Sequence, residues 1–163
     1  MLTTEHVLRF PGTTDGFDGA AKALRVLLDA QAPHPRHRHD LELAFDEIAT
    51  NIVKYGRTSG DVEATIQFGD PTTLTFEDDG VAFDPRAQPA PPVATRRSEL
   101  RIGGLGLVLV RDLCSRFDYE RTPEQRNRLT LSIPADKPDL DRTGEMPAVK
   151  PKTATPIRAK KKR

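Results

Sequence analysis

Cysteine, long apolar runs and net charge are all scarce in this sequence. Cys114 is the single cysteine among 163 residues, so the chain cannot form an internal disulfide, and a cytoplasmic location is the simplest interpretation. No window approaches the run of about 18 apolar residues that a membrane-spanning helix needs. The formal net charge of +1 gives no overall field that favours nucleic acid or a membrane, and we expect neither as a direct partner.

The amino-terminal sequence also lacks a targeting signal. Residues 1–6 contain no basic region followed by an apolar run, so we expect no secretory leader. Hydrophobic residues make up 36% of the chain and charged residues 30%, which is enough for one modest core. The length fits one domain of ordinary size, which we place at residues 1–135.

Periodic hydrophobic residues predict one strand and two helices in the first third of the chain. Residues 5–10 have strand character and end at a Pro-Gly turn. Apolar residues at helical spacing predict a helix over 17–31, which the following prolines stop. We expect Asp40 to be the N-cap of a second helix that reaches Tyr55, where Gly56 closes it.

Alternating apolar and polar residues predict two β-hairpins on either side of a third helix. Residues 62–68 and 73–77 form the first hairpin, and residues 117–121 and 129–133 form the second. The helix predicted over 105–114 is apolar almost all round, so we expect it to be buried, with its cysteine as a small core residue. This order predicts an α+β fold, a two-layer α/β sandwich with helices on one face of a mixed, mostly antiparallel sheet.

Two segments carry no periodicity. A stretch rich in proline, alanine and arginine follows the first hairpin, and we interpret it as a loop of about 15 to 20 residues. Residues 136–163 are rich in Pro, Lys, Asp and Thr, end in a basic run, and lack the apolar residues needed to fold, so they are predicted to be a disordered basic tail. The tail either serves solubility or contacts an acidic partner, nucleic acid or membrane lipid.

Glu47 and Asn51 form the first of three short motifs. They lie four residues apart at the edge of the buried face of the second predicted helix, so both side chains can reach the same point. A carboxylate and an amide oxygen that converge there suit a hard cation such as Mg²⁺. The structural alternative is a solvated glutamate on a surface helix, with the asparagine as a mild helix defect.

The second motif, Asp78-Asp79-Gly80, directly follows a predicted strand. An acid at this place can accept a hydrogen bond from an exocyclic amine, and the glycine lets a flat ring approach the backbone. Two adjacent acids are costly to bury unless a ligand or cation offsets their charge. The structural alternative is a turn at the hairpin exit, because aspartate and glycine are both common turn residues.

The third motif is Gly103-Gly104-Leu105-Gly106-Leu107, at the start of the last predicted helix. Glycines before a helix expose backbone N–H groups that can hold phosphate, helped by the helix N-terminus. The motif is not a Walker A sequence, because no Lys-Ser or Lys-Thr pair follows, and it lacks the βαβ context of a dinucleotide-binding fingerprint. The structural alternative is a flexible glycine linker.

Together and in this order, the three motifs resemble the Bergerat-type ATP-binding fold of the GHKL superfamily. Within that superfamily, the sequence is most similar to the small anti-sigma-factor serine kinases of bacteria. The resemblance covers residues 5–134 and includes the Glu-x-x-x-Asn helix, the segment Asp-x-Gly-x-x-Phe-Asp at 78–84 and the glycine-rich helix start. It implies that the first 135 residues are a histidine-kinase-like ATPase domain.

The resemblance also implies a role for each motif residue. Glu47 is the expected general base, Asn51 the Mg²⁺ ligand, and Asp78 the acceptor for the adenine amine. Residues 86–102 are the expected ATP lid, in which Arg96, Arg97 or Arg101 reaches phosphate oxygens. The implied cofactor-binding residues are Asn51, Asp78, Gly80, Phe83, Arg101, Gly104, Leu105 and Gly106.

The function implied by the resemblance is that of an anti-sigma factor that is also a serine-protein kinase. Such a protein sequesters a sigma factor and uses ATP and Mg²⁺ to phosphorylate a serine of an anti-anti-sigma partner of the STAS type. Relatives also suggest a homodimer. Two alternatives stay open from the sequence: an ATP-binding adaptor that controls a partner without phosphoryl transfer, and a plain ATPase.

Two further features bear on these alternatives. Asn127-Arg128 occupy the place in the final hairpin where family members usually have a Gly-Thr pair. Asparagine tolerates the left-handed conformation, so we expect the turn to survive with the loss of a backbone or hydroxyl contact. His34, His37 and His39 crowd a proline-rich linker, but their spacing matches no closed set of metal ligands. We do not expect His39 to be a phospho-accepting histidine, because the Glu and Asn motif follows in the same helix.

Overall fold

The computed structural model describes residues 4–31, 33–87 and 105–135. The predicted basic tail and most of the predicted lid lie outside these residues. In chain order the elements are β1 (Glu5–Pro11), α1 (Thr14–Gln31), α2 (Pro35–Tyr55), β2 (Asp61–Gln67), β3 (Thr72–Asp78), a short 3-10 helix η1 (Pro85–Ala87), α3 (Leu105–Leu113), β4 (Arg116–Arg121) and β5 (Asn127–Ile133).

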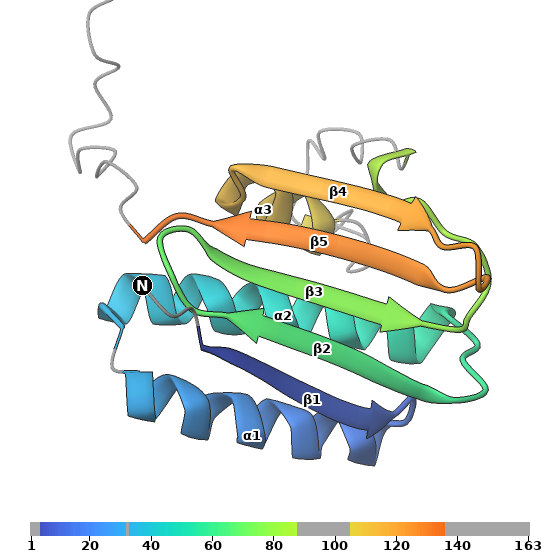
Figure 1. Ribbon diagram of the computed structural model, residues 1–163, viewed down its shortest axis with the longest axis horizontal. Helices are drawn as coiled ribbons and strands as arrows, with labels where there is room; N and C mark the ends of the chain where they lie inside the picture. Colours follow the sequence, from blue (N-terminus) through green and yellow to red (C-terminus); the bar gives the residue numbers. More distant parts are fainter. Residues whose placement is uncertain (1–3, 32, 88–104, 136–163) are drawn as a thin grey trace, which may run out of the picture.

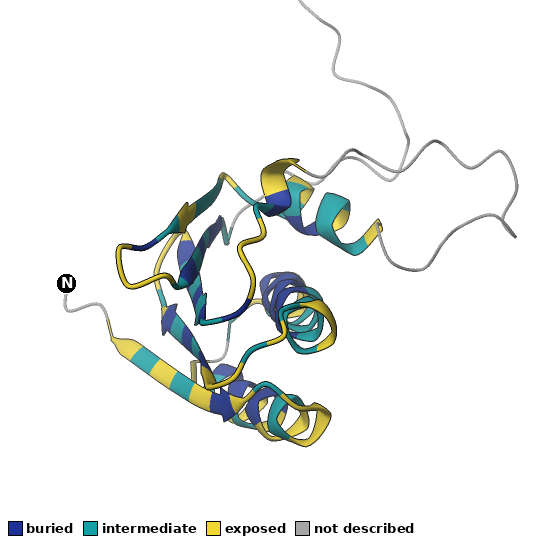
Figure 2. Ribbon diagram, turned by 90° about the vertical axis from the view of Figure 1, so that its right-hand side faces the viewer, coloured by how far each residue is buried: buried dark blue, intermediate teal, exposed yellow. Residues whose placement is uncertain are grey.

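The five strands form one sheet in the order β1-β2-β3-β5-β4. All three helices cover the same face of this sheet, which confirms the predicted two-layer α+β sandwich (Figures 1 and 2). Each neighbouring pair among the described strands is antiparallel, so the mixed character that we predicted is not observed there. The reason is that β5, the second strand of the final hairpin, lies next to β3 and is antiparallel to it. The strand that runs in the same direction as β3 is β4, which lies at the edge of the sheet and pairs with β5 instead.

The core lies between the sheet and the helices, and aromatic rings join the two layers. Alternate residues of β3 are buried because successive strand residues point to opposite faces. Phe45 of α2 is fully buried, and its ring centroid lies 5.5 Å from that of Phe76 in β3 and 6.3 Å from that of Phe10 in β1. These rings fix α2 across the middle of the sheet.

Both long helices begin earlier than the hydrophobic pattern predicts. The α1 helix begins at Thr14, because the Oγ1 atom of Thr13 accepts a hydrogen bond from the backbone N–H of Gly16 at 3.1 Å and caps the helix. The α2 helix begins at Pro35 rather than after Asp40, which is buried inside it. Proline is favoured at a first helical position, since its fixed φ suits the helix and its missing N–H would be unpaired there.

The third helix is less buried than we predicted. Within α3 as described, Val110 is the one fully buried residue, whereas Leu105 is 43% exposed and Leu109 is 44% exposed. The helix packs against α2, and Leu107 and Val110 contact the core, so only a stripe of its surface is covered. Cys114 directly follows the helix and packs partly buried against the core.

The turn between β4 and β5 also differs from the prediction. Gln125, with φ of 59°, adopts the left-handed conformation, and Asn127 is the first residue of β5. The backbone N–H of Thr122 donates to Arg126 O at 2.9 Å, which closes the turn before Asn127 is reached. Asn127 therefore belongs to the sheet, opposite Asp78 and Arg121 on the neighbouring strands.

The described residues contain no cluster of three or more His, Cys, Asp or Glu side chains that could hold a metal ion. Of the three clustered histidines, His37 is buried, and its Nε2 atom lies 2.9 Å from Oγ1 of Thr72. That hydroxyl donates to Gly69 O, so Nε2 of His37 is the donor to it. No described helix is long and apolar enough to cross a membrane.

Burial lowers the pKa of His37 below its usual value, so its neutral form is favoured in the folded protein. We expect the free energy of unfolding to fall as the pH drops below about 6.5, because the unfolded chain then binds a proton that buried His37 binds less readily. Urea denaturation at several pH values measures the slope of the free energy of unfolding against pH. We expect a smaller slope in His37→Gln, whereas His39→Gln, at an exposed position of the same helix, should retain the wild-type slope. Equal slopes in all three proteins would contradict the assignment.

Candidate nucleotide-binding site

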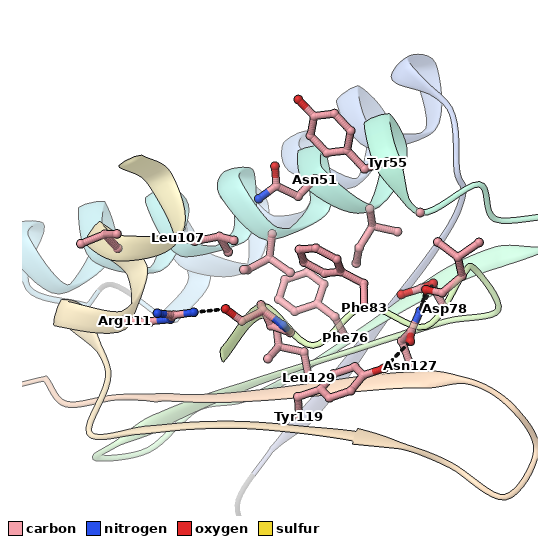
Figure 3. A pocket seen from close by; sticks show the side chains of 16 residues that line it. Asn51, Tyr55, Phe76, Asp78, Phe83, Leu107, Arg111, Tyr119, Asn127 and Leu129 are labelled. Atoms are coloured by element: carbon pink, nitrogen blue, oxygen red, sulfur yellow. Dashed lines mark hydrogen bonds between the residues drawn. The ribbon is translucent and has the colours of Figure 1, made fainter. Parts of the chain in front are cut away.

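A cavity of about 290 Å³ lies between α2, α3 and the carboxyl-terminal half of β3 (Figure 3). Its lining is mainly apolar, with Ile48 and Ile52 from α2, Phe76 from β3, Leu129 from β5 and Leu107 from α3. The side chains in the lining that carry polar groups are Asn51, Tyr55, Asp78, Arg111, Tyr119 and Asn127. An apolar cavity with a few polar groups is typical of a site for an organic ligand.

Local periodicity explains how residues far apart in sequence meet at this cavity. Ile48, Asn51 and Tyr55 lie three or four residues apart, so α2 presents them on one side. On the sheet, Phe76 and Asp78 alternate with outward-facing residues of β3. Because β3 and β5 are paired, Asn127 lies directly opposite Asp78 and reaches the same edge of the cavity.

Asp78 is the buried acid of the site, with 4% of its surface exposed. Its Oδ1 atom accepts hydrogen bonds from the backbone N–H of Gly80 at 2.8 Å and from Nδ2 of Asn127 at 2.9 Å. Within the described part of the chain, its Oδ2 atom makes no hydrogen bond. Asp78 therefore has one acceptor atom that is already used and one that a ligand can use.

The neighbouring acid, Asp79, has a different role. Its carboxylate accepts hydrogen bonds from the Oγ and backbone N–H of Ser59 and from the backbone N–H of Gly60. These bonds, chiefly that from the Ser59 hydroxyl, lower the pKa of Asp79. The two adjacent acids therefore have different roles. Asp78 lines the cavity, whereas Asp79 orders the loop between α2 and β2.

Gly80 is needed for a reason that the sequence did not reveal. A Cβ atom at this position would lie 2.2 Å from the carbonyl oxygen of Gly56 at the end of α2. The same carbonyl accepts a hydrogen bond from the backbone N–H of Val81 at 2.9 Å. Gly80 is not among the described residues that line the cavity. The absence of a side chain at this position lets the end of α2 and the segment after β3 meet through their backbones.

The predicted motif residues are brought together only in part. Asn51, Asp78 and Phe83 line the cavity. Glu47 lies one turn before Asn51 and contacts the start of α3, since a Cβ atom on Gly106 would lie 1.9 Å from its Oε2 atom. Leu105 begins α3 beside this contact but is not in the lining. The other predicted residues, Arg96, Arg97, Arg101 and Gly104, lie outside the described residues.

Arg111, a lining residue that sequence analysis missed, joins α3 to the segment that follows β3. Its guanidinium donates to the backbone carbonyl of Pro85 and lies 5.6 Å from the ring centroid of Phe117. Beside this contact, Asp84 accepts hydrogen bonds from Arg86, which lower the pKa of its carboxyl. Sequence analysis did not predict Arg111 as a lining residue, because an arginine in the last turn of a helix is usually exposed on the surface.

Tyr119 and Asn127 were missed for another reason. The hydroxyl of Tyr119 donates to Oδ1 of Asn127 at 2.7 Å, and Nδ2 of Asn127 donates to Asp78. The sequence pattern predicts a last strand that begins at Leu129, which places Asn127 in the preceding turn. Alternation with the buried Leu129 and Leu131 would have extended that strand back to Asn127 and placed it on the buried face.

Comparison with known proteins shows the family to which this fold belongs. A model of the histidine kinase-like ATPase domain matches residues 10–133. The chain therefore belongs to the family of histidine kinase-like ATPase domains. The serine/threonine-protein kinase BtrW of Bordetella bronchiseptica is 34% identical to it over 101 residues, which cover 60% of this chain and 70% of BtrW.

Solved structures agree with this fold. One is a chain of the SiaB-SiaC complex from Pseudomonas aeruginosa, with a TM-score of 0.57, 18% identity and coverage of 78% of this chain and 88% of that chain. Another contains the RsbU and RsbW domains of Rv1364c from Mycobacterium tuberculosis, with a TM-score of 0.55 and 15% identity. That match covers 81% of this chain and 32% of the other. The family match confirms the resemblance to histidine kinase-like ATPase domains, and the solved structures agree with it in fold alone.

The close approach at Gly80 leads to a stability prediction. Gly80→Ala places a Cβ atom against the backbone carbonyl of Gly56, which cannot rotate away as a side chain could. We expect the free energy of unfolding to fall by about 1–3 kcal/mol, as for other overpacked sites. Chemical denaturation measures the loss. The matched variant Gly19→Ala, where a Cβ atom meets nothing within 4 Å, should not lose stability. Similar losses in both would contradict the role given to Gly80.

Proposed function

We propose that this protein is an ATP-dependent serine kinase that also acts as an anti-sigma factor. In this proposal it phosphorylates a serine of an anti-anti-sigma partner of the STAS type and sequesters a sigma factor. The single observation that supports it most is the placement of Asp78, a buried acid with a free acceptor atom at the edge of an apolar cavity in an ATPase-family domain.

The donor set fits ATP with Mg²⁺. The apolar side chains of Ile52, Phe76 and Leu129 offer flat contact to a purine, and Oδ2 of Asp78 can accept a hydrogen bond from its exocyclic amine. Asn51 lines the same cavity and supplies an amide oxygen, a ligand type that Mg²⁺ accepts together with water. Bound ATP and Mg²⁺ would supply the transferable phosphoryl group and neutralise its charge.

Glu47 is the residue that we assign to proton transfer. It lies one helical turn before Asn51, so both side chains point to the same side of α2. Its carboxylate contacts Gly106 at the start of α3, the helix end at which phosphate is expected. From this position Glu47 can take the proton from a serine hydroxyl as that oxygen attacks, which is the task of a general base.

The partners in this proposal are supported by the relatives rather than by contacts in the structure. BtrW, which is 34% identical over 101 residues, is named as a serine/threonine-protein kinase. The SiaB and RsbW neighbours share the fold at 15–18% identity, so they support the architecture alone. The sigma factor, the serine-bearing antagonist, homodimer formation and a cytoplasmic location remain predictions.

Nucleotide binding is the first test of the proposal. Asp78→Asn exchanges one carboxylate oxygen for an amide nitrogen at the base-binding position, so we expect ATP affinity to fall about tenfold or more. Isothermal titration calorimetry with and without Mg²⁺ measures the change. Asp79→Asn is the matched control, because that acid contacts Ser59 and Gly60 instead, and its affinity should stay close to wild type. Equal losses in both variants would argue against a base-binding role for Asp78.

Phosphoryl transfer is the second test. Wild-type protein, ATP, Mg²⁺ and the antagonist encoded beside its gene should yield phosphoserine, detectable by mass spectrometry. Glu47→Gln should lower the rate about 10²–10⁴-fold while ATP still binds, since only the proton acceptor is lost. Glu42→Gln, which removes an acid that pairs with Arg38 on the same helix, should keep the wild-type rate.

The outcomes of this test separate the alternatives. If the wild-type protein binds ATP and the antagonist but transfers no phosphate, the kinase proposal is wrong and an ATP-binding adaptor remains. Phosphate released at the same rate without any partner would instead indicate a plain ATPase.

A further inference from the structure

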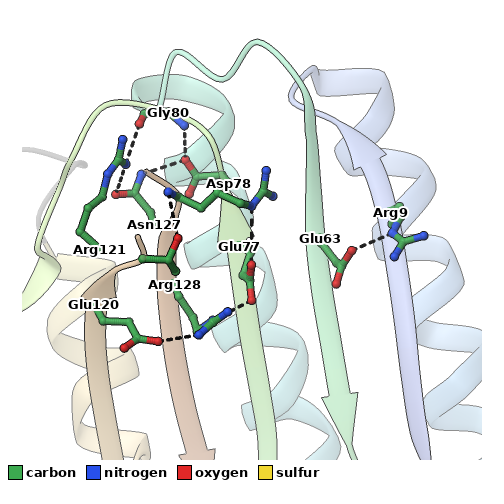
Figure 4. A network of polar contacts seen from close by, with 11 residues as sticks. Arg9, Glu63, Glu77, Asp78, Gly80, Glu120, Arg121, Asn127 and Arg128 are labelled. Atoms are coloured by element: carbon green, nitrogen blue, oxygen red, sulfur yellow. Dashed lines mark hydrogen bonds and ion pairs between the residues drawn. The ribbon is translucent and has the colours of Figure 1, made fainter. Parts of the chain in front are cut away.

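Three polar residues form a row across the end of the sheet, next to the cavity (Figure 4). Asp78 on β3, Asn127 on β5 and Arg121 on β4 are direct neighbours in the strand register. Nδ2 of Asn127 donates to Oδ1 of Asp78 at 2.9 Å, and NH1 of Arg121 donates to Oδ1 of Asn127 at 2.8 Å. The row thus runs from a cation through an amide to a buried acid.

The amide of Asn127 uses every hydrogen-bonding position that it has. Its nitrogen donates twice, to Asp78 and to the backbone carbonyl of Val81 at 3.0 Å. Its oxygen accepts twice, from Arg121 and from the hydroxyl of Tyr119 at 2.7 Å. Four bonds are the full capacity of an asparagine side chain, and the residue is 7% exposed.

The orientation of this amide is fixed by its neighbours. Arginine can only donate hydrogen bonds, and a backbone carbonyl can only accept them. A flipped amide would place its nitrogen against Arg121 and its oxygen against the carbonyl of Val81, and both contacts would be repulsive. The row therefore has one polarity, in which a donor always faces Asp78.

This polarity decides what Asp78 can offer to a ligand. Its Oδ1 atom already accepts from Asn127 and from the backbone N–H of Gly80, whose own carbonyl accepts from Arg121 at 2.9 Å. The hydrogen bonds from Asn127 and Gly80 to Asp78, and from Arg121 to Gly80, hold the carboxylate of Asp78 in place. The remaining atom, Oδ2, is an acceptor on a side chain that lines the cavity. A purine with an amino group at position 6 can donate to it, whereas a 6-oxo purine presents a second acceptor.

We propose that Asn127 is a positioning residue that makes the cavity select 6-amino purines over 6-oxo purines. It acts through Asp78, by holding that carboxylate in one orientation. The inference rests on the proposed function, because it requires that the cavity holds a nucleotide base. It also explains why an asparagine at the start of β5 is compatible with nucleotide binding in this chain.

The test compares binding of ATP with binding of inosine triphosphate, which carries an oxo group at position 6. Wild-type protein should bind ATP at least tenfold more tightly, and calorimetry with Mg²⁺ present gives both dissociation constants. Asn127→Asp keeps the shape and the acceptor for Arg121 but removes the donor to Asp78. We expect this variant to lose most of its affinity for ATP and little for inosine triphosphate, so the ratio of the two constants falls toward one.

Three further variants make the result decisive. Asn127→Ala removes donor and acceptor together and should lower the ratio in the same way. Tyr119→Phe removes one donor to Asn127 and leaves Asp78 untouched, so it should lower the ratio by less, and it serves if the other variants do not fold. Arg128→Gln is the control, because Arg128 is on the same strand but pairs with Glu77 and Glu120 on the opposite face (Figure 4).

The possible failures are distinguishable. If Asn127 only stabilises the sheet, affinity for both nucleotides falls equally, the ratio stays at the wild-type value, and the inference is overturned while the proposed function stands. A ratio that also falls in Arg128→Gln overturns the inference as well, since that side chain does not contact the row. Wild-type protein that binds neither nucleotide refutes the proposed function itself, and the inference with it.

Discussion

The site depends on one buried carboxylate and on the donors that make its burial acceptable. An ionised acid is costly to remove from water unless hydrogen bonds replace the lost hydration. Asp78 obtains these bonds from the backbone of Gly80 and from Asn127, and Asn127 is in turn held by Arg121 and Tyr119. Because these groups come from β3, β4 and β5, the acid ties the end of the sheet into a single unit, and the cavity takes its polar edge from that unit.

The opposite wall of the cavity is set by helix geometry and by one close backbone contact. The spacing of Ile48, Asn51 and Tyr55 presents an amide among apolar groups along α2. The end of that helix meets the exit of β3 where the carbonyl of Gly56 accepts from Val81 and leaves no space for a side chain on Gly80. The distance between the end of α2 and the segment after β3 is thereby fixed at Gly56 and Val81, two residues that line the cavity.

Much of the fold and part of the site could be predicted from the sequence. Strong periodicity predicted the order of the elements. The resemblance assigned Asn51 and Asp78 to one site, and both side chains line the same cavity. The errors occurred where local chemistry outweighs periodicity: Thr13 and Pro35 begin helices earlier than apolar residues do, and the apolar α3 lies at an edge where little covers it. Asn127 was misplaced because the sequence pattern is the same for a polar residue that ends a turn and for one that occupies the first, buried position of a strand.

The row that crosses the sheet has a consequence for how the protein matures. Ribosomal synthesis completes β3, with Asp78, before it completes the hairpin that carries Arg121 and Asn127. During translation the acid therefore lacks its cross-strand donors until the last described strand has emerged. A chain interrupted before β5 would retain the helical motif and the glycine turn, yet it would have no assembled pocket edge. On this reasoning, the polar edge of the pocket is assembled only after β5 has been synthesised.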